Sequence, residues 1–431
     1  MKMGKKITVA WVCEFSNPLV RENLTFRSLA FENAVRAIMG KPAKIMADFD
    51  QWITNGIELM KNYDDLQLHV IAFHKYIKRE KYEFEHDGVK YHILKNEDDI
   101  RFVPNVFRKL LRIKPDKDYK SNRAAVKETL ASINPDIIHY YGAENPDYSI
   151  SALDIDSKKT PLLVQLQTLM SSPGFKENYP LPEKQYEFRS SIEKKVIKNA
   201  SFLLSQLALY RKIVRETINP EAIFFDIAFF SEIINVVKCE KKYDFVYFSA
   251  NIDKAGDLAV EAFILAAKKK KGITMCIIGD YLPEFKEQLE KRLSDNDLLG
   301  NVVFTGRLAT HNDVIEGIQK ARFALLPLKV DLVSGTIREA MAVGLPVVTT
   351  ITPLTPSLNE KRESLLLSKT GDHSAMADNM IKLLEDESLA KTLADNALTT
   401  YKEEYDNQRF ADDLMKTYKA IYNKDYKGLV C

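Results

Sequence analysis

The sequence of 431 residues predicts an α/β protein built from two doubly wound domains in tandem. Three observations support this prediction: short apolar runs rich in strand-forming residues, longer amphipathic segments between them, and two separate series of this alternation. Continuous apolar strands that alternate with helices are typical of parallel sheets covered on both faces. Any ligand is then expected at the carboxyl ends of the strands.

The predicted strands follow the chain in two series. In the first half they cover 7–13, 66–73, 136–141, 161–167 and 201–206. In the second half they cover 244–250, 274–280, 302–306, 323–328 and 346–350. Between the second set, 257–270 and 284–295 show the apolar spacing of amphipathic helices.

The alternation lapses near 232–243 and restarts at a new strand, which places the domain boundary there. We therefore expect a first domain over 1–235 and a second over 240–409. The last helical segment, about 410–431, is expected to pack back on the first domain.

Composition narrows the classes of function. Lys and Arg number 62 and Asp and Glu 60, a net charge of +2, which is too balanced for a dedicated nucleic-acid binder. The four cysteines are far apart and form no CxxC pair, so neither a zinc site nor a disulfide framework is indicated, and a cytoplasmic location is expected. No apolar run approaches the roughly 20 residues of a membrane-spanning helix.

The most informative segment is DLVSGTIREAMAVGLPVV, which starts at Asp331 directly after a predicted strand. Ser334 is expected to cap a helix that Gly335 and Thr336 open. The amino end of such a helix presents N–H groups and a partial positive charge, which suit a diphosphate. Glu339, about one turn in, can accept two hydrogen bonds from a ribose diol, and Asp331 can reach a sugar on that diphosphate.

Two acids at this spacing are weak evidence alone, since an exposed loop Asp and a helix Glu favoured by the dipole give the same pattern. The strand–loop–helix–Gly–Pro–strand context, however, resembles the E-x7-E region of retaining GT-B glycosyltransferases of family four. Asp331 stands in place of the usual first Glu, and EAMAVGLPVV is close to the family's helix and strand. The resemblance covers about 244–400, including FVYFSANIDKAG, MCIIGD and VVFTGRL.

This resemblance implies two Rossmann-like domains that face a cleft, as in the GT-B fold. It implies a UDP- or GDP-linked sugar donor, a glycan or lipid-linked acceptor, no cofactor and no required metal. Glu339 would hold the ribose, Asp331 would orient the sugar, and Lys254 would neutralise the charge of the leaving group. The family's phosphate-binding Arg is replaced by Asn251, and Arg307 either compensates for it or is a solvated loop residue.

In the first domain the resemblance implies the acceptor side of the cleft. ASINPDIIHYYGAENP resembles the family's strand that leads into the cleft, with His139 and Glu144 near its end. A family His that contacts the donor sugar is replaced by Gln167, which can hydrogen-bond but cannot titrate. Ser16 and Asn17, after the first strand, either contact acceptor or phosphate or form an ordinary capped turn.

The segment 104–123 contains seven basic and two acidic residues, and its apolar residues recur with helical spacing. This pattern indicates a helix lying on an anionic bilayer, at the inner face of the cell membrane. The alternative is a solvated basic helix packed on the core. Asp48 and Asp50, like Asp154 and Asp156, match the D-x-D pattern of metal-dependent enzymes, but a helix start is the better interpretation for the first pair.

The preferred interpretation is sugar transfer in bacterial surface polysaccharide or lipid-linked oligosaccharide assembly. Two alternatives stay open. Asn251 and Gln167 motivate a non-catalytic glycosyltransferase-like binding subunit, and a UDP-sugar epimerase would use the same fold. A dinucleotide oxidoreductase is disfavoured because no G-x-G-x-x-G follows the strand over 7–13.

Overall fold

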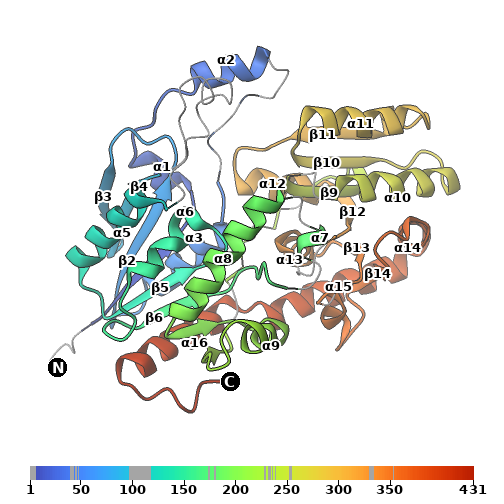
Figure 1. Cartoon of the computed structure of the whole chain (residues 1–431). Coiled ribbons are helices and arrows are strands. Elements are labelled where there is room, and N and C mark those ends of the chain that lie inside the picture. The colour runs from blue at the N-terminus through green and yellow to red at the C-terminus, as the bar shows by residue number, and fades with distance from the viewer. Residues whose placement is uncertain are drawn as a thin grey trace. The chain divides into compact units, whose positions relative to one another are not determined.

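The computed structural model describes residues 6–431 except 39–42, 44–45, 47, 97–117, 173–174, 179–180, 228–229, 232–233, 235, 238, 252–254, 330–333 and 353. The chain divides into two compact units (Figure 1). Unit 1 comprises Met1–Glu32, Phe49–Phe230 and Asn407–Cys431, and unit 2 comprises Asn33–Asp48 and Ser231–Asp406.

Unit 1 is built on an eight-stranded sheet. Its strands are β1 (Ile7–Cys13), β2 (Leu66–His74), β3 (Lys81–His86), β4 (Val89–Lys95), β5 (Ile137–Tyr141), β6 (Leu162–Gln165), β7 (Phe202–Leu204) and β8 (Phe224–Phe225). They are ordered β3-β4-β2-β1-β5-β6-β7-β8, and every neighbouring pair is parallel except β3 and β4. The chain extends the sheet from β1 toward β2 first and toward β5 later. The strand order therefore reverses between β1 and β5, where sheets of this class bind ligands.

The connections of unit 1 are mostly helical, as expected for crossovers between parallel strands. They are α1 (Pro18–Glu22), α3 (Gln51–Met60), α5 (Lys120–Ile133), α6 (Pro146–Ser149), η2 (Ile150–Asp154), α7 (Phe175–Asn178), α8 (Glu183–Asn199) and α9 (Ala208–Thr217). The residues of α2 (Ala30–Ile38) are divided between the two units.

The last helix, α16 (Asn407–Tyr422), belongs to unit 1 although it follows unit 2 in the sequence. Its residues Leu414, Met415 and Tyr418 are buried in the same core as Trp11 of β1. Trp11 Nε1–H donates a hydrogen bond to Tyr418 Oη over 2.8 Å. The C-terminal end of the chain therefore completes the core of the N-terminal sheet.

Unit 2 contains a six-stranded sheet in which every pair is parallel. Its strands are β9 (Tyr243–Asn251), β10 (Met275–Asp280), β11 (Val302–Gly306), β12 (Ala321–Leu326), β13 (Val347–Thr350) and β14 (Leu365–Ser368). The order is β11-β10-β9-β12-β13-β14, so the strand order reverses between β9 and β12. The carboxyl ends of these two strands mark the expected ligand site of unit 2.

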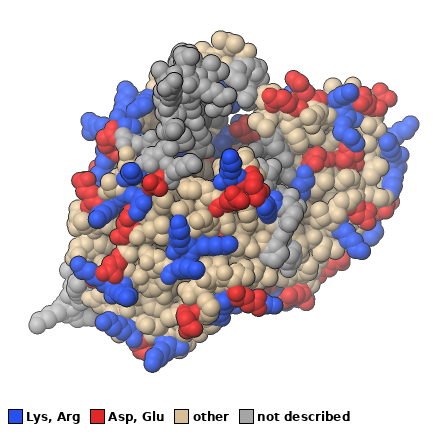
Figure 2. Space-filling view, in the orientation of Figure 1, with Lys and Arg blue, Asp and Glu red and all other residues tan. Residues whose placement is uncertain are grey.

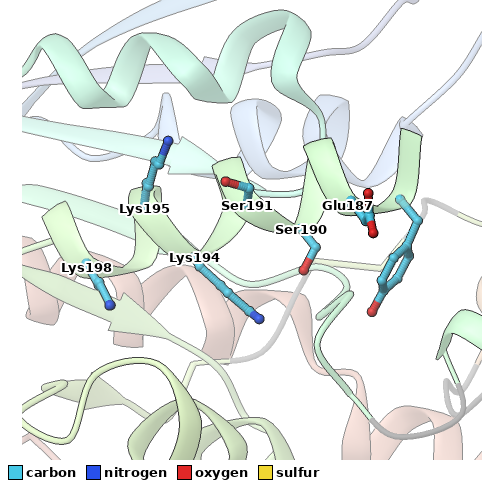
Figure 3. Close-up of a pocket in the computed structure, with 7 residues that line it drawn as sticks. Glu187, Ser190, Ser191, Lys194, Lys195 and Lys198 are labelled. Atoms are coloured by element: carbon cyan, nitrogen blue, oxygen red, sulfur yellow. The ribbon is translucent and has the colours of Figure 1, made fainter. Parts of the chain in front are cut away.

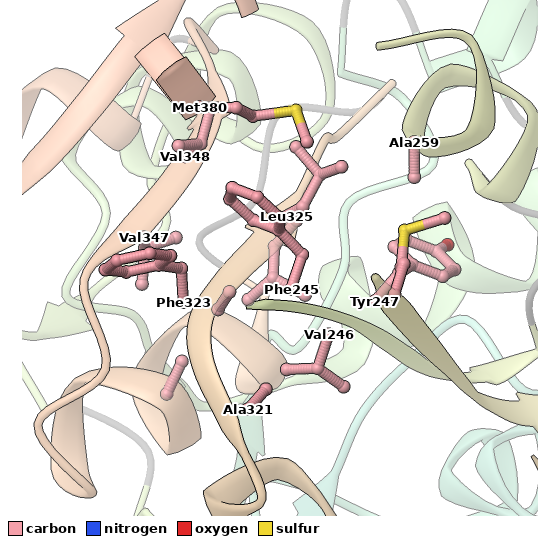
Figure 4. Close-up of a cluster of buried hydrophobic side chains, with 14 of the residues drawn as sticks. Phe245, Val246, Tyr247, Ala259, Ala321, Phe323, Leu325, Val347, Val348 and Met380 are labelled. Carbon is pink, nitrogen blue, oxygen red and sulfur yellow. The ribbon is translucent and has the colours of Figure 1, made fainter. Parts of the chain in front are cut away.

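Helices connect the strands of unit 2 and cover its sheet. They are α10 (Gly256–Lys269), α11 (Pro283–Ser294), η4 (Leu299–Asn301), α12 (His311–Gln319), α13 (Gly335–Ala342), η5 (Thr355–Asn359), α14 (His373–Glu385) and α15 (Glu387–Glu404). Figure 4 shows part of the core, where Phe245 of β9 and Phe323 of β12 lie with ring centroids 5.5 Å apart. Leu325, Val347 and Met380 are fully buried in the same cluster.

The predicted fold class is confirmed, because both units are parallel sheets with helical crossovers. Each of the ten predicted strands coincides with an observed one, and the predicted helices over 257–270 and 284–295 correspond to α10 and α11. The sequence analysis did not predict β3, β4, β8 or β14. Among the described residues, no helix is both long and apolar enough to cross a membrane.

Candidate active site

The amino end of α13 forms at the carboxyl edge of the unit 2 sheet, as the sequence predicted. Ser334 has extended backbone angles (φ −67°, ψ 147°), and its side chain accepts a hydrogen bond from the Thr336 N–H over 3.1 Å. Ile337, Ala340 and Met341 are fully buried, and this spacing fixes the face that α13 packs on the sheet. The opposite side of the first turn, which includes Gly335 and Thr336, stays partly exposed.

Glu339 lies on α13 with 9% of its surface exposed. Its Oε1 lies 3.9 Å from Nε2 of His311, the first residue of α12. The sequence analysis missed His311, because nothing in its local sequence connects it with a helix that begins 24 residues later. The pair brings the ends of the β11–α12 and β12–α13 connections together around one carboxylate.

A lysine and an aspartate join the two strands at which the sheet order of unit 2 reverses. Lys329 follows β12, and Asp257 lies in the first turn of α10, which follows β9. Lys329 Nζ donates to both carboxylate oxygens of Asp257, each over 2.8 Å. Both side chains are partly exposed, at 31% and 43%.

Several predicted donor-site residues lie where the structure gives no side-chain description. Asp331 and Lys254 are outside the described residues. Asn251 ends β9 and pairs in register with Asp280, but its side chain is not described. Arg307 is exposed in the loop after β11. Their predicted roles therefore stay predictions.

Ser16 and Asn17, at the carboxyl end of β1, form a capped turn. The Asn17 side chain accepts a hydrogen bond from the Val20 N–H over 2.8 Å and caps α1, which begins at Pro18. Ser16 is 1% exposed, and its Oγ accepts a hydrogen bond from Arg21 Nη1 over 3.2 Å. These contacts show that the turn is capped, and a contact of Ser16 or Asn17 with acceptor or phosphate stays a prediction.

The prediction that His139 contacts an acceptor is corrected by its burial. His139 is 0% exposed, its ring stacks on Tyr141 with centroids 4.2 Å apart, and its Nδ1 lies 2.6 Å from Tyr418 Oη. Burial lowers the pKa of His139 to about 3, so the ring is neutral at pH 7. The prediction failed because α16 covers this part of β5, and the local sequence gives no sign of that helix.

Glu144 lies at the carboxyl end of β5, next to the point where the strand order of unit 1 reverses. The chain turns through Gly142, whose φ of 101° favours glycine, and the Glu144 carboxylate accepts a hydrogen bond from the Ala143 N–H over 2.9 Å. Glu144 is 6% exposed, and burial raises its pKa to about 7. The site prediction placed Glu144 at an active-site edge, and the topology is compatible with that placement.

A second buried carboxyl group, Glu193 of α8, was not singled out by the sequence analysis. Its oxygens accept hydrogen bonds from the Met170 N–H over 2.9 Å and the Ser171 hydroxyl over 3.3 Å. Burial, together with the nearby Glu144 carboxylate, raises the pKa of Glu193 to about 8. A buried glutamate inside a basic helix gives no distinguishing sequence signal.

Gln167 follows β6 and is half-buried. Its Nε2 donates a hydrogen bond to the Tyr141 carbonyl oxygen over 3.1 Å. This contact ties the end of β6 to the end of β5. The amide group is therefore positioned at the same sheet edge as Glu144, and no structural finding assigns it a sugar contact.

A pocket of about 450 Å³ lies along α8 in unit 1. Its lining residues are Tyr186, Glu187, Ser190, Ser191, Lys194, Lys195 and Lys198. In Figure 3 Lys194 and Lys198 project from one side of the helix and Lys195 from the other. Elsewhere on the face in Figure 2, basic and acidic side chains are interspersed. The α8 lysines thus add local positive charge to a chain that is nearly neutral overall.

The described residues contain no group of three or more His, Cys, Asp or Glu side chains placed to hold a metal ion. Of the two D-x-D matches, Asp50 occupies the N-cap position of α3, as predicted. Asp154 accepts a hydrogen bond from Arg123 Nε over 2.7 Å. Asp50 Oδ1 accepts a hydrogen bond from Trp52 Nε1–H over 3.4 Å, so both side chains have partners within unit 1.

Comparison with protein families matches residues 243–386 to the family described as glycosyl transferases group 1. This range runs from β9 through α14 and includes Lys329, Glu339 and the amino end of α13. The resemblance that the sequence suggested is confirmed over this range. Comparison with curated proteins finds no match.

Solved structures that resemble nearly the whole chain include the following three. Sucrose-phosphate synthase from Thermosynechococcus elongatus is 13% identical, with a TM-score of 0.66 over 97% of this chain and 100% of that one. Anabaena HepE, in complex with UDP and glucose, is 14% identical, with a TM-score of 0.62 over 96% and 100%. The E. coli trehalose-6-phosphate structure, bound with UDP-2-fluoro glucose, is 10% identical, with a TM-score of 0.64 over 96% and 99%.

At these identities the structural likeness establishes the fold. The family match covers about one third of the chain and adds the class of reaction, which is glycosyl transfer. The chain has the two Rossmann-like domains of GT-B glycosyltransferases, its residues 243–386 resemble the glycosyl transferases of group 1, and these findings together support a glycosyltransferase.

Proposed function

We propose that this protein transfers a sugar from a nucleoside-diphosphate donor to a glycan or lipid-linked acceptor, with retention of configuration. The observation that carries the proposal is the capped amino end of α13, with buried Glu339, inside the range that matches group 1 glycosyl transferases. HepE and the E. coli structure were determined with UDP or a UDP-sugar analogue, and so was TarM from S. aureus. UDP-sugars are therefore the first donors to test.

Each donor-side residue has a role set by its chemistry. Glu339 is a carboxylate that can accept both hydroxyl hydrogens of a ribose diol. The N–H groups of the first turn of α13 can donate to the diphosphate, helped by the helix dipole. Asp331 is assigned to the sugar and Lys254 to the charge on the leaving diphosphate, both from the resemblance.

Retention requires the acceptor to attack the face of the sugar from which the diphosphate leaves. A bond forms between the acceptor oxygen and the anomeric carbon, while the bond from that carbon to the diphosphate oxygen breaks. The acceptor proton passes to the leaving diphosphate, so no protein base is needed at this step. The presence of Gln167, which cannot titrate, is compatible with this route.

Substitution of Glu339 tests the donor site directly. Glu339→Gln is expected to weaken UDP affinity by roughly tenfold, because a charged acceptor of two hydrogen bonds is replaced by a neutral group with one acceptor. Glu363→Gln is the matched control, since Glu363 is exposed beyond the site. Titration calorimetry with UDP measures both, and equal effects would refute the assignment.

Turnover with a panel of UDP- and GDP-sugars separates the remaining possibilities. Slow release of free sugar in the absence of acceptor supports a transferase, since water then replaces the acceptor. A new UDP-sugar formed without acceptor would indicate an epimerase. Undetectable donor binding across the panel would indicate a non-catalytic subunit.

The proposed setting is the inner face of a bacterial membrane, where surface polysaccharides and lipid-linked oligosaccharides are assembled. The basic segment 104–123 lies largely outside the described residues, but Tyr119 near its end stacks on Phe188 of α8, with centroids 6.4 Å apart. The described end of this segment therefore contacts α8, the helix that carries Lys194, Lys195 and Lys198. Each lysine near an anionic bilayer contributes about 1 kcal/mol.

Sedimentation with lipid vesicles tests this setting. We expect the protein to sediment with phosphatidylglycerol vesicles but not with phosphatidylcholine vesicles, and the binding to weaken as salt is raised. Exchanging Lys194, Lys195 and Lys198 together for Gln should reduce it. Equal sedimentation with both lipids, or none with either, would contradict the membrane assignment and leave the donor chemistry standing.

A further inference from the structure

The Lys329–Asp257 pair sits where the order of strands in unit 2 reverses. β9 and β12 are neighbours in the sheet, and the chain leaves them toward opposite edges. The connections that follow these two strands therefore diverge, and sheets of this class bind ligands outside the carboxyl ends of such strands. Asp257 belongs to the first connection and Lys329 to the second.

Among the described residues, Lys329 keeps one hydrogen to donate. A lysine ammonium has three N–H groups, and two of them serve the oxygens of Asp257 at 2.8 Å. Among the described residues, no other hydrogen bond or ion pair of Lys329 Nζ is found. With 31% of its side chain exposed, the ammonium is held in place and still reachable by a ligand.

The negative charge of Asp257 does not cancel the positive charge at this edge of the sheet. Asp257 lies in the first turn of α10, where the positive end of the helix dipole offsets a carboxylate. The amino end of α13 adds a second positive helix terminus on the other connection. Among the described residues, this edge of the sheet therefore presents the Lys329 ammonium and two helix amino ends beside the carboxylates of Asp257 and Glu339.

The end of β9, the strand that neighbours β12 in the sheet, lacks a positive charge at its last residue. The last residue of β9 is Asn251, where the resembling family has a phosphate-binding Arg. An amide can donate to a phosphate oxygen but carries no charge to balance it. A cation that approaches the same edge from β12 would restore that balance.

We propose that Lys329, positioned by Asp257, donates a hydrogen bond to the diphosphate of the nucleotide donor and supplies the charge that Asn251 lacks. The proposal rests on the proposed donor site and adds a binding residue to it. Asp257 acts through Lys329 and is a positioning residue.

The test is UDP affinity of the full-length protein, measured by titration calorimetry alongside uridine, which has no phosphate. Lys329→Met should weaken UDP affinity about tenfold or more, because a charged hydrogen bond is lost. Lys329→Arg should stay within about threefold of the wild type. Asp257→Asn should weaken UDP affinity by less than Lys329→Met, since the ammonium loses its anchor but keeps its charge. Uridine affinity should be unchanged in all three variants.

A matched control lies at the other end of α10. Lys269 pairs with Asp378 of α14, and both side chains are exposed. Along a helix of 14 residues this pair is roughly 20 Å from Asp257. Lys269→Met removes the same charge from the same unit and should leave UDP affinity unchanged. Thermal unfolding of each variant confirms that it is folded.

The outcomes distinguish this inference from the proposed function. If the wild type binds UDP and Lys329→Met binds it equally well, the inference is wrong and the donor site stands. Equal losses of UDP and uridine binding in Lys329→Met would show that the pair only braces the two connections, which also overturns it. A wild type that binds neither UDP nor GDP overturns the proposed function and this inference together.

Discussion

Replacing Tyr418 with Phe is expected to destabilise unit 1, because one hydroxyl group serves two buried partners. Trp11 Nε1–H donates to Tyr418 Oη over 2.8 Å, and His139 Nδ1 lies 2.6 Å from the same oxygen. All three side chains are fully buried. The three residues join β1, β5 and α16, so the substitution weakens the attachment of the last helix to the sheet.

The expected loss of stability can be worked out from the two side chains, Trp11 and His139, that lose their hydrogen-bond partner. A buried hydrogen bond contributes about 1 kcal/mol net, and a buried polar group left without a partner costs about 1–3 kcal/mol. Water cannot take the place of the hydroxyl, because the side chains around it have no exposed surface. Because Trp11 Nε1 and His139 Nδ1 both lose their partner, the free energy of unfolding is expected to fall by roughly 2–5 kcal/mol.

Urea unfolding followed by tryptophan fluorescence measures this loss. The chain has two tryptophans, Trp11 and Trp52, and both belong to unit 1, so the signal reports on that unit. Tyr422→Phe is the control, since Tyr422 lies one turn later on α16 and is 37% exposed. A Tyr418→Phe variant within ~0.5 kcal/mol of this control would show that the hydroxyl does not hold the helix.

Two further predictions concern buried charge and backbone strain. The pKa of Glu193 is about 8 in the fold against an ordinary value of 4.5, so its contribution to stability is present below pH 4.5 and is lost as the pH rises toward 8. Glu193→Gln should therefore raise the free energy of unfolding by roughly 1–3 kcal/mol at pH 8 and leave it nearly unchanged at pH 5, and a difference independent of pH would contradict this. Gly344→Ala should cost about 1 kcal/mol, because Gly344 has φ 69° and a Cβ there meets no neighbour, so strain alone acts. Calorimetric unfolding that is unchanged by the alanine would show that the turn relaxes.

The sequence predicted the strands that are continuous apolar runs and missed those with another pattern. The hairpin of β3 and β4 is an example. Polar and apolar residues alternate along β3, which is the edge strand of the sheet. Its turn, Asp87-Gly88, has positive φ angles of 49° and 77°. Asp-Gly between two strand-like runs is a strong hairpin signal, and it was available in the sequence.

The site was predictable where it depends on local sequence and unpredictable where it depends on distant segments. The cap at Ser334 and the buried face of α13 follow from residues within one helix. The burial of His139 depends on Tyr418, 279 residues away, and no local pattern contains that contact. The contact of Glu339 with His311 likewise depends on the order of strands in the sheet.

The two sheet edges differ in how far the fold has engaged their polar groups. At the edge of unit 1, Asn17 caps a helix, Ser16 binds Arg21, and Glu144 folds back on the Ala143 N–H. At the edge of unit 2, Lys329 has only Asp257 as a partner among the described residues, and one N–H is left to donate. Groups already satisfied by the fold gain little from a ligand, because binding must first break those contacts. Substitutions at the unit 2 edge should therefore change ligand affinity, whereas those at the unit 1 edge should first change stability.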